Sequence, residues 1–346
     1  MKYLTSSDGD IALAAAALAA GKLVAFPTET VYGLGGDAFN PQALARIFEA
    51  KNRPRFDPLI IHIAEKGALE KIADPGALDS EGRERLALLA ARLWPGPLTL
   101  ILPKKKAVPD LATSGLPTAA VRFPDHQTAQ KLILLSTGAV AAPSANPFGY
   151  LSPTRAEHVR EQLGDKTDFI IDGGKTKVGL ESTVLDISSS QARLLRPGGC
   201  SLEQIEALIG RVAVFSPLSS DSDAGRSSPG QLKSHYAPRT PLVLYAPGRL
   251  GSLAPKGGEG FLFFDRSSCG AWLAAGNAGG ANRGKAFFLS ETGRAAEAAA
   301  NLFDILHKMD DLGLSLIRAE EAPPEGLGAA INDRLRRAEA AGECRC

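Results

Sequence analysis

The order of apolar and polar positions up to about residue 210 predicts an α/β domain, because short apolar runs alternate with amphipathic stretches. The apolar runs are expected to form buried strands at 23–26, 59–63, 98–102, 119–123, 139–142, 169–172, 183–187 and 193–196. The amphipathic stretches are expected to form helices at 11–20, 42–50, 80–93, 126–136, 153–163 and 202–209. This alternation is typical of a sheet with helices on its faces.

Polar residues mark where several of these helices begin. Asn40 precedes a proline in the first turn, and Ser201 with Gln204 three positions later forms a capping box. By the same reasoning, Asp10 is expected to cap the helix at 11–20, and Ser152 the helix that starts at the next residue. Each cap would satisfy backbone N–H groups that a first helical turn leaves without a partner.

The composition changes at residues 216–230, which are rich in serine, glycine and proline and are expected to form a linker. Beyond them, strands are expected at 242–245, 261–264, 286–289 and 314–317, with helices at 294–311 and 328–341 and a loop at 274–284. The chain is therefore expected to hold a larger α/β domain at 1–212, a linker at 213–240 and a smaller α/β domain at 241–346.

Composition narrows the classes of protein that are possible. Hydrophobic residues make up 44% of the 346-residue chain, charged residues 22%, and the net charge is +1, so we expect a folded protein that binds anions only through local clusters. There is no apolar run of about 18 residues and no basic leader before residues 11–20, so we expect neither a membrane span nor a signal peptide. Four cysteines, including Cys344 and Cys346, are too few for a disulfide scaffold, so we expect a cytoplasmic protein with a reduced C-terminal tail.

Two motifs in the first domain have residue types suited to small anionic ligands. The segment 27–36 follows a strand and is dense in hydroxyls and glycines, but it lacks the spacing of a P-loop or a dinucleotide fingerprint. It is either a ligand loop or a plain connection. The segment 51–59 carries Lys51, Arg53 and Arg55 between prolines, and these cations could complement a helix dipole or grip phosphates. His62, in the strand that follows, is more typical of a satisfied core histidine.

Other polar residues also follow predicted strands. Ser144 and Asn146 lie between prolines after one strand, and Arg122 and Arg196 end two others. Ligands of α/β sheets bind at strand ends, so these residues predict a convergent anion site, although serine and asparagine are also common in turns. No metalloprotease, cysteine-pair or nucleophile-elbow motif is present, so we expect chemistry based on positioning and charge stabilisation.

Taken in order, the motifs resemble the YrdC-like L-threonylcarbamoyladenylate synthases in their longer, two-domain form. The matching segments are PTETVYGLG at 27–35, KNRP to DPL at 51–59, LWPGPLT at 93–99, AVRFP at 120–124, APSAN at 142–146, GLESTV at 179–184, LRPG at 195–198, SPG at 228–230 and HYAP at 235–238. The resemblance implies a YrdC-like twisted mixed sheet with helices on its faces, plus a smaller C-terminal Rossmann-like α/β domain.

The resemblance also implies a reaction. L-Threonine, bicarbonate and ATP would give L-threonylcarbamoyl-AMP and pyrophosphate, with Mg²⁺ arriving on the ATP phosphates rather than in a protein cage. The product would pass to the tRNA threonylcarbamoyl transferase machinery, which modifies adenosine next to the anticodon. A weak contact with tRNA itself is also part of this expectation.

Site residues carry over by motif. Those expected at ATP are Lys51, Arg53, Asp57, Thr118, Ser144, Asn146, Ser152, Arg196, His235 and Tyr236. Those expected at L-threonine are Thr30, His62, Arg122, Ala142 and Ser182, with Arg122 pairing the substrate carboxylate. His235 and Tyr236 would fold back from the linker as a lid. Asp57 departs from the asparagine usual in the family, and a carboxylate beside phosphates is unfavourable unless it is paired or faces Mg²⁺.

Two alternative functions are less consistent with the sequence. A non-catalytic module that binds tRNA or double-stranded RNA would use basic surface, which the net charge of +1 and the scarcity of clustered aromatics weaken. A carbamoyl transferase sharing the first domain would need further catalytic domains, for which this chain has no room.

Overall fold

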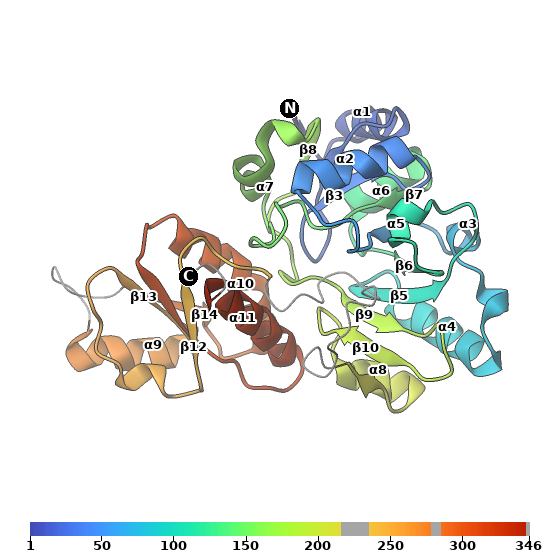
Figure 1. The fold of residues 1–346 in the computed structure, drawn as a ribbon. Helices are drawn as coiled ribbons and strands as arrows, with labels where there is room; N and C mark the ends of the chain where they lie inside the picture. The colour runs from blue at the N-terminus through green and yellow to red at the C-terminus, as the bar shows by residue number, and fades with distance from the viewer. Residues whose placement is uncertain (216–234, 278–284, 344–346) are drawn as a thin grey trace. The chain divides into compact units, whose positions relative to one another are not determined.

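The computed structural model describes residues 1–215, 235–277 and 285–343 (Figure 1). The expected linker at 216–230 and the terminal Cys344 and Cys346 lie outside these residues. The chain divides into two compact units. The first unit comprises Met1–Phe148, Pro153–Lys177 and Glu181–Gln231, and the second comprises Gly149–Ser152, Val178–Leu180 and Leu232–Cys346.

The first unit is built on a mixed sheet. Its strands are β1 (Lys2–Thr5), β2 (Val24–Phe26), β3 (Gly33–Asp37), β4 (Ile60–Ile63), β5 (Leu98–Pro103), β6 (Thr118–Arg122), β7 (Ala139–Ala141), β8 (Phe169–Asp172), β9 (Thr183–Asp186), β10 (Arg193–Arg196) and β11 (Ala213–Val214). Within the described residues, these eleven strands run in the order β1-β8-β2-β3-β7-β4-β6-β5-β9-β10-β11. The sheet is mixed, with parallel pairs such as β4 with β6 and antiparallel pairs such as β5 with β6.

Helices cover both faces of this sheet, as the amphipathic pattern predicts. They are α1 (Asp8–Ala19), α2 (Pro41–Lys51), α3 (Leu69–Ile72), α4 (Ser80–Leu93), α5 (Asp110–Thr113), α6 (Gln127–Leu135), α7 (Ala156–Leu163) and α8 (Leu202–Ile209). Leu23, directly before β2, and Ala25 within it face the core lined by α2, α4 and α8, whereas Val24 and Phe26 face the core lined by α1 and α6. The alternation along a strand therefore separates two hydrophobic cores.

Some expected helix starts are confirmed and others are wrong. Asn40 caps α2 by accepting hydrogen bonds from two backbone N–H groups, and Ser201 forms the expected capping box. Asp10 does not cap α1: Ser7 does, because the Asp10 carboxylate accepts from the backbone N and the hydroxyl of Thr5. The helix expected from Pro153 begins at Ala156 instead.

Ser152 therefore does not cap α7, whose N-cap residue is Arg155. The backbone before α7 is held extended, because the carbonyl oxygen of Pro153 accepts from the N–H of Tyr32 at 2.9 Å. A proline that is engaged in a long-range contact cannot also open a helical turn. The prediction failed because the competing contact lies far away in the sequence.

Strand β3 was expected to be part of a loop, because its sequence, Gly33–Asp37, is glycine-rich. The structure shows why glycine is needed there. A Cβ atom on Gly35 would lie 2.8 Å from side-chain carbons of both Phe26 and Val140. Glycine lets β3 pass between β2 and β7, and the 27–32 segment connects the end of β2 to the start of β3.

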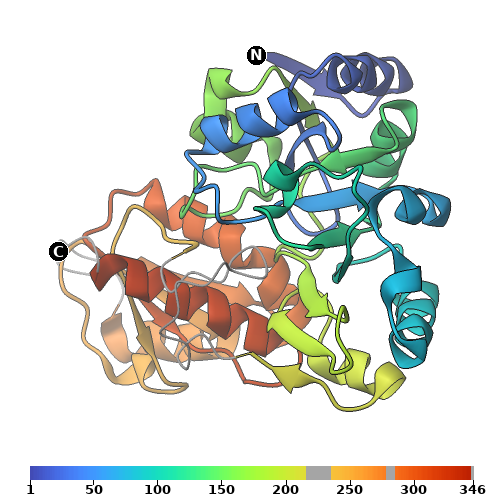
Figure 2. The ribbon, with the colours of Figure 1, turned by 45° about the vertical axis from the view of Figure 1, so that its right-hand side comes forward.

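The second unit is a smaller α/β unit whose described strands are all parallel. They are β12 (Leu242–Tyr245), β13 (Glu259–Asp265), β14 (Lys285–Ser290) and β15 (Leu316–Glu320), in the order β12-β15-β13-β14. Helix α9 (Arg266–Trp272), which was not predicted, packs Trp272 on Phe261 and Phe263. Helices α10 (Ala295–Asp310) and α11 (Leu327–Glu343) pack together on the sheet (Figure 2). The expected smaller α/β fold is confirmed, and the structure adds that its described strands are parallel.

None of the helices in the described part of the chain is long and apolar enough to cross a membrane.

Candidate functional site

Three of the sequence motifs, at 27–36, 51–59 and 142–146, come together near the C-terminal end of α2. Lys51, the last residue of α2, donates from Nζ to the carbonyl oxygen of Ser144 at 2.5 Å and to that of Asn146. The carbonyl of Lys51 in turn accepts from the N–H of Phe148. A β-bridge between Gly33 and Ser144 brings the 27–36 segment to the same place. Segments that lie about a hundred residues apart in sequence thus share one buried ammonium group.

Lys51 is only 1% exposed. Burial, followed by the charge of Arg53, holds the pKa of Lys51 well below its usual value, and the opposing charges of Asp57 and Glu181 act to raise it. Among the described residues, no carboxylate lies within ion-pair distance of the Lys51 ammonium. An anionic ligand beside Lys51 would therefore stabilise its charged form.

Arg53 is buried within the turn that follows α2. Its Nε donates to the carbonyl oxygen of Asp57 at 2.9 Å, and its Nη2 donates to that of Pro58 at 2.8 Å. Nη2 also lies 3.0 Å from the Asp57 carboxylate, and the guanidinium stands 5.8 Å from the ring centre of Phe148. The carboxylate that looked unfavourable beside phosphates is thus paired with Arg53. Arg55, the third cation of this segment, is exposed.

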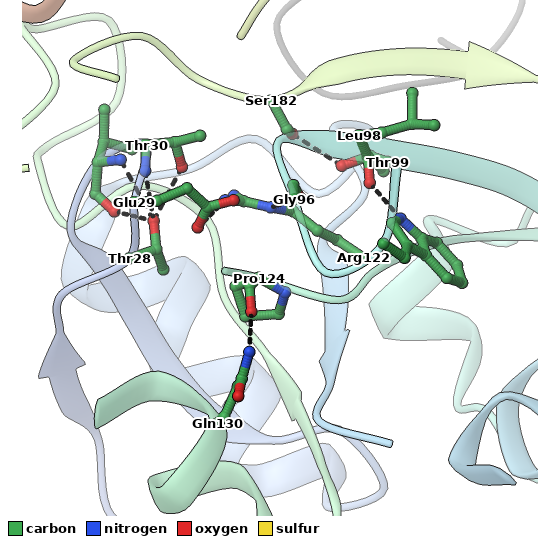
Figure 3. Close-up of polar contacts among 12 residues, drawn as sticks. Thr28, Glu29, Thr30, Gly96, Leu98, Thr99, Arg122, Pro124, Gln130 and Ser182 are labelled. Carbon is green, nitrogen blue, oxygen red and sulfur yellow. Dashed lines mark hydrogen bonds and ion pairs between the residues drawn. The ribbon is translucent and has the colours of Figure 1, made fainter. Parts of the chain in front are cut away.

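The sheet register aligns a second group of polar residues. His62 on β4 and Thr99 on β5 are both Cα partners of Arg122 on β6, so these three residues form one row across three strands. The hydroxyl of Thr99 lies 2.7 Å from that of Ser182, which directly precedes β9 (Figure 3). Strand pairing therefore brings His62, Arg122 and Ser182 together.

Arg196 is connected to this second group of polar residues by hydrogen bonds to Ser182. Its Nε and Nη2 donate to the carbonyl oxygen of Ser182 at 3.1 and 2.8 Å, and Nη2 also lies 3.2 Å from the Ser182 hydroxyl. The turn after Arg196 can pass close to the backbone at Glu181 because residue 198 is glycine. A Cβ atom there would lie 2.4 Å from the carbonyl oxygen of Glu181.

Arg122 forms a buried ion pair that the sequence did not predict. Its Nη2 lies 2.7 Å from Oε2 of Glu29, both side chains are 4% exposed, and its Nε donates to the carbonyl oxygen of Gly96 at 3.4 Å (Figure 3). Glu29 is the only acidic residue of the 27–36 segment, which was the one available signal. Its partner lies on a strand more than ninety residues away, so only the fold reveals the pair.

The residues beside this pair are buried and neutral. The hydroxyls of Thr28 and Thr30 lie 2.8 Å apart, and Thr28 donates to the carbonyl oxygen of Val31. Burial, followed by the positive charge of Arg122, lowers the pKa of His62 to about 3. Nδ1 of His62 lies 3.2 Å from the carbonyl oxygen of Ile60. At neutral pH this imidazole is therefore uncharged.

Thr118 and Ala142 lie apart from the Arg122 row. Thr118 begins β6 and is half-buried, whereas Arg122 ends the same strand, so at about 3.3 Å per residue their Cα atoms are roughly 13 Å apart. The N–H of Ala142 donates to the carbonyl oxygen of Ile60 near the start of β4. Ser144 and Asn146 are thus grouped around Lys51, and His62 and Ser182 lie by the Arg122 row.

The remaining predicted residues belong to the second unit. The backbone N–H of His235 donates to the carbonyl oxygen of Arg337 on α11. The ring of Tyr236 lies under the guanidinium of Arg334 at 4.8 Å and 5.9 Å from the ring of Phe303. The carbonyl oxygen of Ser152 lies 3.2 Å from Nε2 of His307 on α10. These residues are anchored on the two long helices of that unit.

Comparison with known proteins gives matches across the chain. A family model for Sua5, YciO and YrdC proteins, described as telomere recombination, matches residues 16–198, and one described as the C-terminal domain of threonylcarbamoyl-AMP synthase matches residues 200–341. A threonylcarbamoyl-AMP synthase of Pyrococcus abyssi is 44% identical over 328 residues, covering 95% of this chain and 93% of that protein. One of Bacillus subtilis is 42% identical, covering 97% of this chain and 94% of that protein.

A solved structure is similar over the same extent. The crystal structure of Pyrococcus abyssi Sua5 complexed with L-threonine superposes with a TM-score of 0.85 at 40% sequence identity. The match covers 99% of this chain and 98% of that one, so the similarity includes both units.

Proposed function

Because the chain belongs to the threonylcarbamoyl-AMP synthase family in its two-domain form, we propose that it synthesises L-threonylcarbamoyl-AMP from L-threonine, bicarbonate and ATP, releasing pyrophosphate. The observation that carries the proposal is the pair of buried cationic groups in the first unit, around Lys51 and around Arg122. The reaction joins two anions, a carbamate and ATP, so its site needs buried positive charge in two adjoining places.

The proposed reaction has two stages. Threonine and bicarbonate form a carbamate, and a carbamate oxygen then attacks the α-phosphate of ATP in line, with pyrophosphate as the leaving group. Such a displacement needs orientation and charge stabilisation more than a covalent nucleophile. This requirement fits a site built of lysine, arginine and hydroxyl groups.

Lys51 is suited to hold a phosphate. An ammonium group has three N–H donors, and two of those of Lys51 point to the carbonyl oxygens of Ser144 and Asn146. The third remains for a phosphate oxygen. In the proposal Arg53, Asp57 and Thr118 line the same ATP site, with Asp57 acting by holding Arg53 in place.

Arg196 is expected to bridge the two substrates. Its Nε and Nη2 are engaged by Ser182, so Nη1 is the nitrogen that would face a phosphate or carbamate oxygen. On the threonine side, Arg122 would pair the substrate carboxylate, while Thr30, His62, Ser182 and the backbone of Ala142 would contact the rest of the amino acid. A neutral His62 can accept a hydrogen bond from the threonine hydroxyl without adding charge.

Ser152, His235 and Tyr236 complete the proposed ATP site. We propose that the linker, at 213–240 between domains at 1–212 and 241–346, closes over bound substrates as a lid. Tyr236 itself contacts Arg334 on α11 and Phe303 on α10, within the second unit. Closure would exclude water, which competes with the carbamate for the α-phosphate.

Magnesium fits the proposal as a companion of ATP. Among the described residues, no group of three or more histidine, cysteine or acidic side chains could form a metal cage. Mg²⁺ prefers phosphate oxygens and retained waters, so it is expected to bind through the nucleotide, where it would neutralise phosphate charge. We further place the reaction in the cytoplasm, where the tRNA threonylcarbamoyl transferase machinery would use the product. RNA binding without catalysis is not favoured, since the full-length relatives are synthases.

The test is pyrophosphate release by the purified protein. With ATP, bicarbonate and L-threonine the wild type should release pyrophosphate and form the labile adenylate, and omission of threonine should abolish both. Lys51→Met should lose at least about 100-fold in kcat, because a phosphate-facing charge is removed. The control, Lys66→Met, changes an exposed lysine and should retain activity. Pyrophosphate release that does not depend on threonine would reject the proposed function.

A further inference from the structure

Within the described residues, the buried carboxylate of Glu29 forms an ion pair with Arg122. It is 3% exposed, and its Oε2 lies 2.7 Å from Nη2 of Arg122. In the part of the chain that the structure describes, neither of its oxygens accepts a hydrogen bond. A buried carboxylate usually accepts several, so Glu29 has unused capacity at the place where the proposed threonine site begins.

The arrangement matches the charges of a free amino acid. L-Threonine carries a carboxylate and an ammonium on the same carbon, and the proposed function already pairs its carboxylate with Arg122. Within this site, we propose that Glu29 binds the α-ammonium group of L-threonine and accepts a proton from it. This inference rests on the proposed function and adds a residue that recognises the amino group.

Exchange of partners explains why the pair is present before substrate binds. In the free protein, Glu29 and Arg122 neutralise each other in a buried place, where an isolated charge would be costly. When a zwitterion enters, its carboxylate takes Arg122 and its ammonium takes Glu29, so the net charge of the pocket does not change. A ligand with a carboxylate but no ammonium would instead meet the negative charge of Glu29.

The proton transfer follows from the chemistry of carbamate formation. An ammonium group has no lone pair, so an N–H bond must break, leaving its electron pair on nitrogen while the proton goes to a Glu29 oxygen. The free amine then attacks the carbon of bicarbonate, a C–N bond forms and water leaves, giving the carbamate anion. Protonated Glu29 is neutral, and it therefore does not repel the carbamate that has just formed.

The surroundings leave few groups that could replace Glu29. Arg122 on β6 and His126 before α6 both interact electrostatically with it, and His62 on β4 faces Arg122. Burial lowers the pKa of His126, opposed by the charge of Glu29, with smaller effects from Lys177 and Asp125. His62 is neutral near pH 7, so Glu29 is the anionic group that faces Arg122.

The first test separates recognition of the amino group from a structural role. The probes are L-threonine and 3-hydroxybutanoate, which keeps the carboxylate and hydroxyl but has hydrogen in place of the ammonium. Affinities are measured by calorimetry, or by competition, for the wild type, Glu29→Gln and the control Glu65→Gln, which changes an exposed carboxylate. Glu29→Gln should reduce the preference for threonine over 3-hydroxybutanoate by at least about tenfold, the size expected for loss of a charge-assisted hydrogen bond. An unchanged preference would overturn the inference.

The second test addresses the proton. Glu29→Gln should lower the rate of threonine-dependent pyrophosphate release by about 100-fold at neutral pH, within the range of general-base effects. The deficit should shrink as pH rises, because free amine then forms in solution. A deficit that stays constant with pH would reject proton transfer.

Folding and function are checked separately. If Glu29→Gln does not fold, as thermal melting would show, Glu29→Asp keeps the charge with one fewer methylene and should retain the preference for threonine while losing rate. Loss of that preference in Glu29→Asp would contradict the inference. Failure of the wild type to release pyrophosphate would reject the proposed function, whereas the preference measured by binding tests Glu29 alone.

Discussion

The guanidinium of Arg53 lies 3.0 Å from the carboxylate of Asp57, and both side chains are at least 95% buried, with exposures of 5% and 2%. Removing one partner of a buried pair leaves the other charge without compensation. Asp57→Ala should therefore lower the free energy of unfolding by about 3 kcal/mol, measured by urea denaturation. Asp57→Asn should cost less, because an amide can still accept a hydrogen bond.

The control for that pair is Asp165→Ala, because this carboxylate is 98% exposed. Its free energy of unfolding should stay within about 0.5 kcal/mol of the wild type. If Asp57→Ala were as stable as the wild type, the pair would not hold the turn together. Asp57 would then have to act on the ligand directly.

His62 should make stability depend on pH in a defined window. Its pKa is about 3 in the folded protein and 6.5 when unfolded, so only the unfolded state gains its proton as pH falls from 6.5 towards 3. Stability from this residue is complete above pH 6.5 and is lost below it, by about 2 kcal/mol between pH 7 and pH 5. Urea midpoints of the wild type and His62→Gln, compared at several pH values, measure the difference.

His126 and His307, whose pKa values burial also lowers, remain in both proteins and cancel in that comparison. Parallel curves for the wild type and His62→Gln would show that His62 takes up protons equally in both states. That result would contradict its neutral form in the folded protein.

Gly198 allows the turn after Arg196 to pass the backbone at Ser182. Gly198→Ala would place a Cβ within 2.5 Å of backbone atoms of that segment, so the backbone must shift. The expected cost is about 1–3 kcal/mol in stability, as for overpacking, together with a fall in activity because Arg196 moves. Gly67→Ala is the matched control, because nothing lies within 4 Å of its added Cβ. Equal melting temperatures and rates for the two variants would contradict the close approach.

Asp310, the last residue of α10, holds the segment at Arg239 and Thr240, which leads into β12 of the second unit. Its carboxylate accepts from the backbone N–H groups of Arg239 and Thr240 and from both side chains, at 2.8 to 3.0 Å. Asp310→Ala should lose about 2 kcal/mol, since the backbone N–H and hydroxyl of the buried Thr240 lose their acceptor. Asp311→Ala removes only an exposed ion pair to Arg239 and should cost less than about 0.5 kcal/mol. Calorimetric melting would compare them, and equal losses would show that the anchor is not Asp310.

The sequence predicted two helix starts correctly, where the capping residue lies next to the helix in the chain. The cap at Asn40 and the capping box at Ser201 were both read correctly, because cap and helix are adjacent in sequence. Ser152 was assigned wrongly as a cap, because a contact between Pro153 and Tyr32 holds that segment extended. Strand β3 was missed because its glycines suit close packing against Phe26 and Val140, not intrinsic strand preference.

For the candidate site, the sequence indicated which residue types occur at strand ends but not which of them pair. Strand ends indicated that Arg122 and Arg196 would face a common region, and register does place Arg122 beside His62. The ion partner of Arg122, Glu29, could not be found, since a carboxylate in a turn carries no sign of the strand it will meet. The pairing of Asp57 with Arg53 also needed the fold, because it depends on the turn geometry after α2.

The second unit includes two short segments, Gly149–Ser152 and Val178–Leu180, that are separated in sequence from its main part, which begins at Leu232. Gly179 has φ +73, and a Cβ there would lie 2.5 Å from the carbonyl oxygen of Ala299 on α10, while the carbonyl of Gly149 accepts from Ala237. A fragment that stops before residue 232 would keep both segments but lose the helix and peptide against which they pack. Anyone who wishes to express the first unit alone should therefore redesign these two loops rather than simply shorten the gene.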